Sequence, residues 1–151
     1  MISNYCFFFV CCLIAASSLA LEFHDCGSAH GSIESVKISD CDPETMDFCP
    51  FKKGKNVSIE LTFKTSEEVT KIRVAVYGII AGVPMPFLIP NPDGCKDSGL
   101  TCPMAADSEG KYELSIPIKQ IYPKLKVNVK LELQDQNSQE IICVLIPSKI
   151  V

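Results

Sequence analysis

Alternation of apolar and polar residues constrains this chain more than any other feature of its sequence. Val57, Ile59, Leu61 and Phe63 are each followed by a polar residue, the pattern of a strand with one buried face. We find no stretch with the 3.6-residue period of a helix. Further strands are predicted at residues 36–38, 72–76, 112–118, 125–133 and, as a continuous apolar run, 141–146. Six or seven short strands at this spacing predict an all-β, two-layer antiparallel sandwich.

The N-terminus has the pattern of a secretory signal. The first twenty residues contain no Lys, Arg, Asp or Glu, and an apolar stretch runs from Cys6 to Ala16. Small residues at Ser18 and Ala20 then occupy the positions that a signal peptidase reads. The apolar stretch is shorter than the ~20 residues needed to span a bilayer. We therefore expect residues 1–20 to be a signal peptide and residues 21–151 to be one mature, secreted domain.

The cysteines predict a disulfide framework. Six remain after the predicted signal is removed, and an even number in a small exported domain implies disulfide pairing. Cys41–Cys49 and Cys95–Cys102 each close a short loop rich in turn-forming residues, so we favour these pairs among the possible ones. The remaining pair, Cys26–Cys143, would join the two ends of the domain. Zinc is disfavoured because there is no C-x-x-C pair, and we predict no metal site and no cofactor.

Charge and motif content argue against two function classes. The formal net charge is −4, and no basic cluster is denser than Lys52, Lys53 and Lys55, which argues against nucleic-acid binding. There is no G-x-S-x-G nucleophile elbow, and both histidines, His24 and His30, lie in one short N-terminal segment. We therefore expect a protein that is not an enzyme.

The proline-rich segment 82–92 does not have the pattern of an ordinary core strand. Its four prolines remove backbone donors and exclude a central strand. Val83, Met85, Phe87 and Ile89 nevertheless fall on alternate positions. This pattern predicts a stiff, extended edge of the sandwich that lines or closes a cavity, although side chains that simply fill the core remain the alternative.

Two further residues are singled out by their surroundings. Tyr122 precedes Pro123, which favours an extended backbone, and its ring is either at a pocket rim or packed in the core. Asn56 begins an Asn-Val-Ser sequon and shares its strand face with Ser58 and Glu60. A glycan on Asn56 would therefore point to solvent, and we predict N-glycosylation there.

Several motifs together resemble one known family. They are Phe-His-Asp-Cys-Gly-Ser at 23–28, Gly-Ile-Ile-Ala-Gly-Val-Pro at 78–84, the Pro-Phe-x-Ile-Pro-x-Pro-Asp-Gly-Cys run at 86–95, and Leu-Gln-Asp at 133–135. In these motifs the chain resembles the Niemann–Pick type C-two cholesterol-transfer proteins of the ML lipid-recognition family, which also includes dust-mite group-two allergens. The resemblance covers essentially the whole mature chain and all six cysteines, and residues 78–103 are its most specific part.

The resemblance implies a fold, a site and a function. The implied fold is an immunoglobulin-like β-sandwich of about seven antiparallel strands with an apolar pocket between the sheets and the three disulfides favoured above. Phe87 and Tyr122 become the expected gate of the pocket. The lipid-binding residues expected by position, with Val83 added from the proline-rich segment, are Ile38, Val83, Met85, Phe87, Ile118, Tyr122 and Pro123. The chain departs from the family pattern at Leu131, which replaces a tryptophan, and at Met85 and Ile118, which replace valines.

The resemblance implies a carrier that binds a sterol and transfers it to anionic membranes or to a membrane sterol acceptor. We expect a monomer that is secreted and that can reach the lysosomal lumen. Three alternatives stay open at this point: an invertebrate carrier of fatty acids, semiochemicals or microbial lipids, a lipid-modifying enzyme, and an adhesion or receptor-binding sandwich with a filled core.

Overall fold

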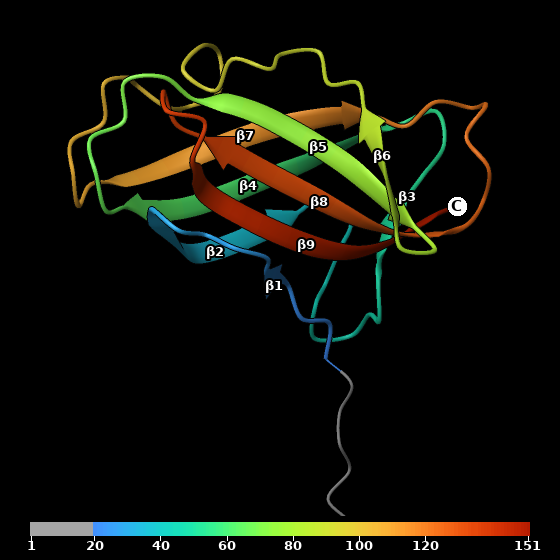
Figure 1. The fold of residues 1–151 in the computed structure, drawn as a ribbon. Coiled ribbons are helices and arrows are strands. Elements are labelled where there is room, and N and C mark those ends of the chain that lie inside the picture. Colours follow the sequence, from blue (N-terminus) through green and yellow to red (C-terminus); the bar gives the residue numbers. More distant parts are fainter. Residues whose placement is uncertain (1–19) are drawn as a thin grey trace, which may run out of the picture.

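Two β-sheets lie face to face in the computed structural model, which describes residues 20–151 (Figure 1). The larger sheet, sheet A, has the strand order β1–β9–β8–β5–β6, and β3 also pairs with β9. Its strands are β1 (His24–Asp25), β3 (Cys49–Phe51), β5 (Arg73–Ile80), β6 (Val83–Phe87), β8 (Lys126–Gln134) and β9 (Glu140–Ile150). The smaller sheet, sheet B, has the order β2–β4–β7. Its strands are β2 (Gly31–Ile38), β4 (Asn56–Thr65) and β7 (Glu109–Pro117).

The all-β sandwich is confirmed, and the alternating segments are its strands. In β4, the four apolar residues from Val57 to Phe63 are buried while Asn56 and Ser58 are exposed. The structure adds two strands that the sequence did not predict, β1 and β3, which have two and three residues. Both are too short for an alternation to be visible. The pairing of β3 with β9 is parallel, whereas the other strand pairs are antiparallel.

The core lies between the two sheets and is apolar. Cross-strand partners share a face, so the register places Leu131 beside Val144 and Leu61 beside Tyr112 on the inner faces. All four side chains are buried. The described residues contain no helix long and apolar enough to cross a membrane.

The three predicted disulfides are confirmed. Cys26–Cys143 joins the segment after β1 to β9 across a separation of 117 residues. Cys41–Cys49 and Cys95–Cys102 close loops with separations of 8 and 7 residues. In the chain-entropy account, the long loop closed by Cys26–Cys143 stabilises the fold by about 4–5 kcal/mol. The predicted signal peptide lies outside the described residues, except for Ala20.

Candidate functional site

The proline-rich segment forms an edge strand, as predicted. β6 pairs only with β5, with Met85 opposite Gly78 and Phe87 opposite Val76. It lies at the same end of the sandwich as the loop of residues 118–125 that joins β7 to β8 (Figure 1). Prolines at Pro84 and Pro86 are compatible with this position because an edge strand needs no donors on its outer side.

An apolar cavity of about 240 Å³ lies between β6, the loop of residues 118–125 and the inner face of sheet A. None of the side chains that line it is charged. They come from β5, β6, β8, β9 and the loop, and are Gly78, Ile80, Met85, Pro86, Phe87, Tyr122, Pro123, Leu125, Val127 and Ile150. Such a surface suits an apolar ligand, and the Tyr122 phenol is its one ionisable lining group.

Gly78 makes room for the ring that covers the cavity. It is buried on β5, in the same inward alternation as Val74 and Val76. A Cβ atom at this position would lie 2.9 Å from Phe87 Cε2 and 3.1 Å from Val127 Cγ2. The Phe87 ring therefore occupies space that any other residue at position 78 would fill.

Phe87 and Tyr122 meet at this end of the cavity and border it together. Their ring centroids are 5.5 Å apart and the ring planes meet at 80°, an edge-to-face contact. Both side chains are half-buried, so each ring has one side on the cavity and one side toward solvent. The loop that carries Tyr122 is anchored at its start, where Ile118 exchanges backbone hydrogen bonds with the turn at residues 54–55.

The structure brings together four of the seven predicted lipid-binding residues. Met85, Phe87, Tyr122 and Pro123 line the cavity. Ile38 and Ile118 are buried in the core and are not among the lining residues, and the side chain of Val83 is 60% exposed beside the cavity.

Other residues that line the cavity were not predicted as lipid-binding residues. Three of them, Gly78, Leu125 and Val127, could have been recognised from the sequence. Leu125 and Val127 fall on the inward positions of a segment predicted as a strand. Gly78 continues the inward alternation of Val74 and Val76, and a glycine at such a position marks a close approach.

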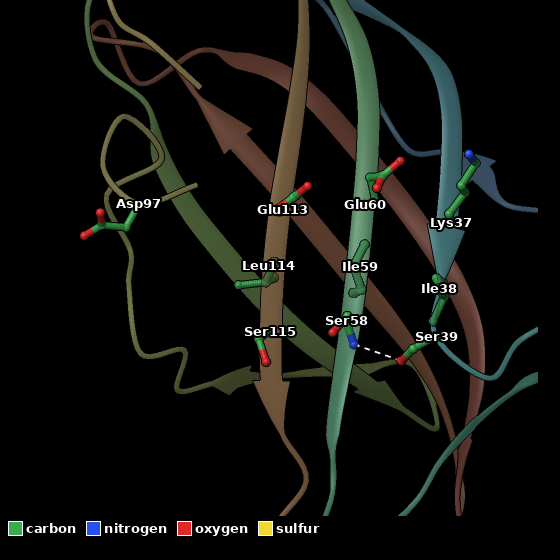
Figure 2. Close-up of a pocket in the computed structure, with 10 residues that line it drawn as sticks. All are labelled: Lys37, Ile38, Ser39, Ser58, Ile59, Glu60, Asp97, Glu113, Leu114 and Ser115. Atoms are coloured by element: carbon green, nitrogen blue, oxygen red, sulfur yellow. Dashed lines mark hydrogen bonds between the residues drawn. The ribbon is translucent and has the colours of Figure 1, made fainter. Parts of the chain in front are cut away.

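A second hollow lies on sheet B and has a different character (Figure 2). It has a volume of about 600 Å³, and its walls include Lys37, Glu60, Asp97 and Glu113. Hydroxyl groups also line it, and the Ser58 N–H donates a hydrogen bond of 3.0 Å to Ser39 Oγ. A groove with charged walls cannot desolvate a lipid tail, so the cavity behind Phe87 is the better lipid site. Within residues 20–151, no three His, Cys, Asp or Glu side chains are grouped to hold a metal ion.

Comparisons with known proteins agree with this geometry. The family model for the ML domain matches residues 20–150. The chain is 43% identical to NPC intracellular cholesterol transporter 2 homolog a of Drosophila melanogaster, covering 93% of this chain and 94% of that protein. It is 37% identical to NPC intracellular cholesterol transporter 2 of Bos taurus, with 91% of each chain covered. The crystal structure of a Niemann-Pick type C2 protein from Japanese carpenter ant superimposes with a TM-score of 0.82 at 30% identity, covering 86% of this chain and 99% of that one. By family match, sequence identity and fold, this chain belongs to the ML domain family.

Proposed function

We propose that the protein is a non-enzymatic carrier that binds a sterol in the cavity behind Phe87 and Tyr122 and transfers it to a membrane or a membrane acceptor. The single observation that carries this proposal is the uncharged cavity closed by two aromatic rings. The relatives named as cholesterol transporters match over nearly their whole length, which supports the same ligand class here.

The physical chemistry of the cavity favours binding over catalysis. Removing a few hundred Å² of apolar ligand surface from water at about 25 cal/mol per Å² favours binding by about 10 kcal/mol, before the entropy of association is subtracted. With an association cost of about 4 kcal/mol, the surplus of about 6 kcal/mol corresponds to a dissociation constant of tens of micromolar. The ligand hydroxyl would stay near the two rings, where the Tyr122 phenol provides a polar group.

The cavity must widen to accept a sterol. Its volume of about 240 Å³ is below the range of about 300–1,000 Å³ that is usual for ligand pockets. Displacement of the Phe87 and Tyr122 rings would enlarge it, since both rings border it and neither is fully buried. Ile38 and Ile118 would contact the ligand only if the widened cavity reached deeper between the sheets, and Val83 only if β6 moved.

The rim of the cavity is suited to contact with a membrane or an acceptor. Leu88 and Ile121 are 80% and 85% exposed, and Val83 and Met85 are 60% and 54% exposed. Exposed large apolar side chains grouped around a cavity are typical of an interaction surface. Lys119, Lys124 and Lys126, all exposed, flank Ile121 in sequence and would attract anionic lipid headgroups.

The proposed location is extracellular or lysosomal. Three disulfides in one small domain are typical of an oxidising compartment. Asn56 is exposed at the first position of β4, which leaves the predicted glycan free to extend into solvent. The protein is expected to act as a monomer.

A second candidate ligand is a fatty acid or another slender apolar molecule. The observation that favours it is the small volume of the cavity, which a single acyl chain would fill with less movement of the rings. The function would then be the transport of fatty acids, semiochemicals or microbial lipids.

The experiment is to extract lipid from the protein produced in a eukaryotic host, identify it by mass spectrometry, and titrate the emptied protein with a fluorescent sterol. Stoichiometric sterol, with binding lost in Phe87→Ala, is the expected result. The matched control is Tyr77→Ala, which removes an aromatic ring from β5, next in sequence to the cavity residue Gly78. Extraction of a fatty acid in place of a sterol would support the second candidate function. A protein that contains no lipid and binds neither probe would refute the carrier.

A further inference from the structure

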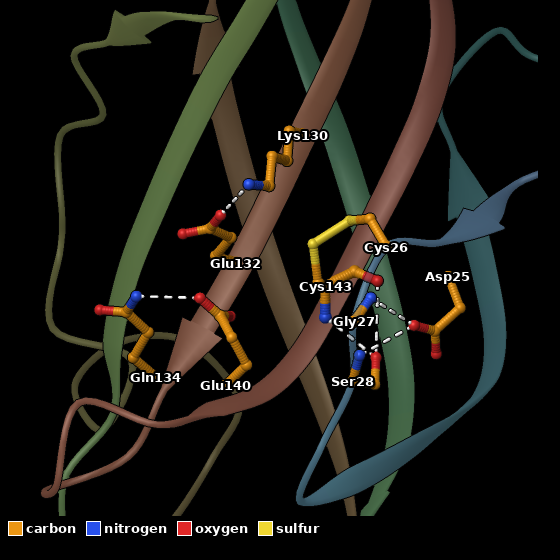
Figure 3. The surroundings of a disulfide bond; sticks show 9 residues. All are labelled: Asp25, Cys26, Gly27, Ser28, Lys130, Glu132, Gln134, Glu140 and Cys143. Carbon is orange, nitrogen blue, oxygen red and sulfur yellow. Dashed lines mark hydrogen bonds and ion pairs between the residues drawn. A yellow bond between two sulfur atoms is a disulfide. The ribbon is translucent and has the colours of Figure 1, made fainter.

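Two glutamates lie together on sheet A, on the face that carries the Cys26–Cys143 disulfide (Figure 3). Glu132 is on β8 and Glu140 begins β9, and the register sets Gln134 opposite Glu140 and Cys143 opposite Glu132. The Glu132 side chain is only 8% exposed. Burial disfavours the charged form of a carboxyl group, so the buried Glu132 and the half-buried Glu140 need compensation.

Among the described residues, two polar contacts reach the four carboxylate oxygens of the pair. Lys130 Nζ lies 2.5 Å from Glu132 Oε1, and Gln134 Nε2 donates to Glu140 Oε1 at 3.0 Å. Glu140 Oε2 is buried and receives no hydrogen bond from any of the described residues. Its neighbour is the Glu132 carboxyl group, which has no proton to donate while it is ionised. A proton held between the two groups would supply the missing hydrogen bond.

β5 does not provide a second buried cation. Tyr77 lies beside Lys130, whose Nζ is 5.8 Å from the centre of its ring. Arg73 is opposite Gln134 in the register, but it is exposed to solvent. Lys130 is therefore the cation that is held against the pair, and one positive charge faces two carboxylates.

The titratable groups of the N-terminal segment are engaged elsewhere. The Asp25 carboxylate accepts hydrogen bonds from the backbone N–H groups of Gly27 and Ser28. The backbone N–H of His30 donates to the Glu140 carbonyl, while its ring Nδ1 lies 3.1 Å from Glu67 Oε1. Neither side chain supplies a hydrogen bond to Glu140 Oε2.

We propose that Glu132 and Glu140 form a proton-binding pair that makes the β8–β9 hairpin more stable in acid than at neutral pH. Burial raises the pKa of Glu140, and the adjacent Glu132 charge raises it further, against the opposing effect of the Gln134 hydrogen bond. A pKa that is raised in the folded state contributes stability that is fully present at a pH below the ordinary glutamate pKa. That stability is lost as the pH rises through the folded-state value.

Lys130 does not obscure this effect. Its hydrogen bond to Glu132 raises its pKa against the effect of burial. Stability from a raised lysine pKa is present throughout the acid and neutral range, since it is lost only above the ordinary lysine value. The stability contributed by Lys130 is therefore the same at acid and at neutral pH, and it does not affect the comparison.

The test is thermal unfolding of the full mature protein at about pH 5 and about pH 7.5 for the wild type, Glu140→Gln and the control Glu109→Gln. Glu109 is an exposed carboxylate at the start of β7, in the other sheet. Glutamine keeps the shape of a protonated glutamate and can donate to Glu132. We expect Glu140→Gln to raise the melting temperature at neutral pH by about 2–4 °C and to reduce the gain on acidification, while Glu109→Gln follows the wild type.

An identical pH dependence in Glu140→Gln and the wild type would overturn the proposal. A measurement on the unmodified protein covers the case in which the variant does not fold. The Glu140 carboxyl ¹³C resonance should titrate with a midpoint above the ordinary glutamate value, and a midpoint at or below that value would refute the proton-binding pair.

Discussion

The ring of Phe87 meets the ring of Tyr122 edge to face, with 5.5 Å between their centroids, although one ends β6 and the other belongs to the loop between β7 and β8. An aromatic pair of this kind contributes about 0.5–1.5 kcal/mol beyond the area it buries. A contribution of this size is only about one to three times the thermal energy, so separation of the two rings costs little.

Removal of one ring should accelerate ligand release. In Tyr122→Ala, the lost contact is expected to increase the dissociation rate of a bound fluorescent sterol several-fold, up to about tenfold. Stopped-flow displacement by unlabelled sterol measures this rate. Tyr77→Ala, outside the cavity lining, should leave it unchanged. An unaltered rate in Tyr122→Ala would mean that the ring does not gate the cavity.

A methyl group at position 78 should displace the Phe87 ring. The added Cβ of Gly78→Ala would lie 2.9 Å from Phe87 Cε2, closer than side chains normally approach. We expect a loss of about 1–3 kcal/mol in the free energy of unfolding and weaker sterol binding. In the double variant with Phe87→Ala the clash with the ring is absent, so the two effects should not add. Additive losses in denaturant unfolding would contradict this account.

The exposed rim should affect transfer but not binding. Replacing both Leu88 and Ile121 with serine removes two of the most exposed large apolar side chains. We expect several-fold slower sterol transfer to anionic vesicles with unchanged affinity in solution, because neither residue lines the cavity. Unchanged transfer to protein-free vesicles would exclude these two residues from membrane contact.

The hydroxyl of Tyr112 should be dispensable for stability. Burial alone raises the pKa of this phenol above its ordinary value of 10.0, and no hydrogen bond contributes. Tyr112→Phe is therefore expected to leave the free energy of unfolding unchanged or to increase it by up to about 1 kcal/mol. A large loss of stability in urea unfolding would reveal an important hydrogen bond.

The same residue predicts a response to alkali. The stability linked to the protonated phenol is present at a pH below the ordinary tyrosine pKa. It is lost as the pH rises through the higher pKa of the folded state. The wild type should thus lose more stability above the ordinary value than Tyr112→Phe does. Equal losses would show that other groups dominate alkaline unfolding.

The sequon at Asn56 should carry a glycan in a eukaryotic secretory host. Asn56→Gln and Ser58→Ala each destroy the sequon, and the second keeps the asparagine itself. Both variants should migrate faster than the wild type on a denaturing gel and should no longer respond to a glycosidase. Equal mobility of all three proteins would show that the site is unused.

The sequence predicted which residues form strands better than it predicted which of them line the cavity. Alternation identifies the inward face of a strand, and it correctly placed the four apolar residues of β4 in the core. It does not tell how close to a cavity an inward residue lies. Ile118 and Val127 both face inward, yet only Val127 lines the cavity. The difference depends on the path of the loop of residues 118–125 and on the close approach of Phe87 to Gly78, which are set by contacts between distant segments.

The position of β9 late in the sequence determines when sheet A can be completed. β9 is hydrogen-bonded to β1, β3 and β8, so without residues 140–150 sheet A keeps only the pairs β8–β5 and β5–β6. A chain still emerging from the ribosome holds β1 and β3 without their partner, and both are too short to persist alone. Complete assembly of sheet A must therefore follow synthesis of residues 140–150. Loss of residues 146–150 should therefore be strongly destabilising, because Ile146 and Ile150 are buried and residues 148–150 pair with β3.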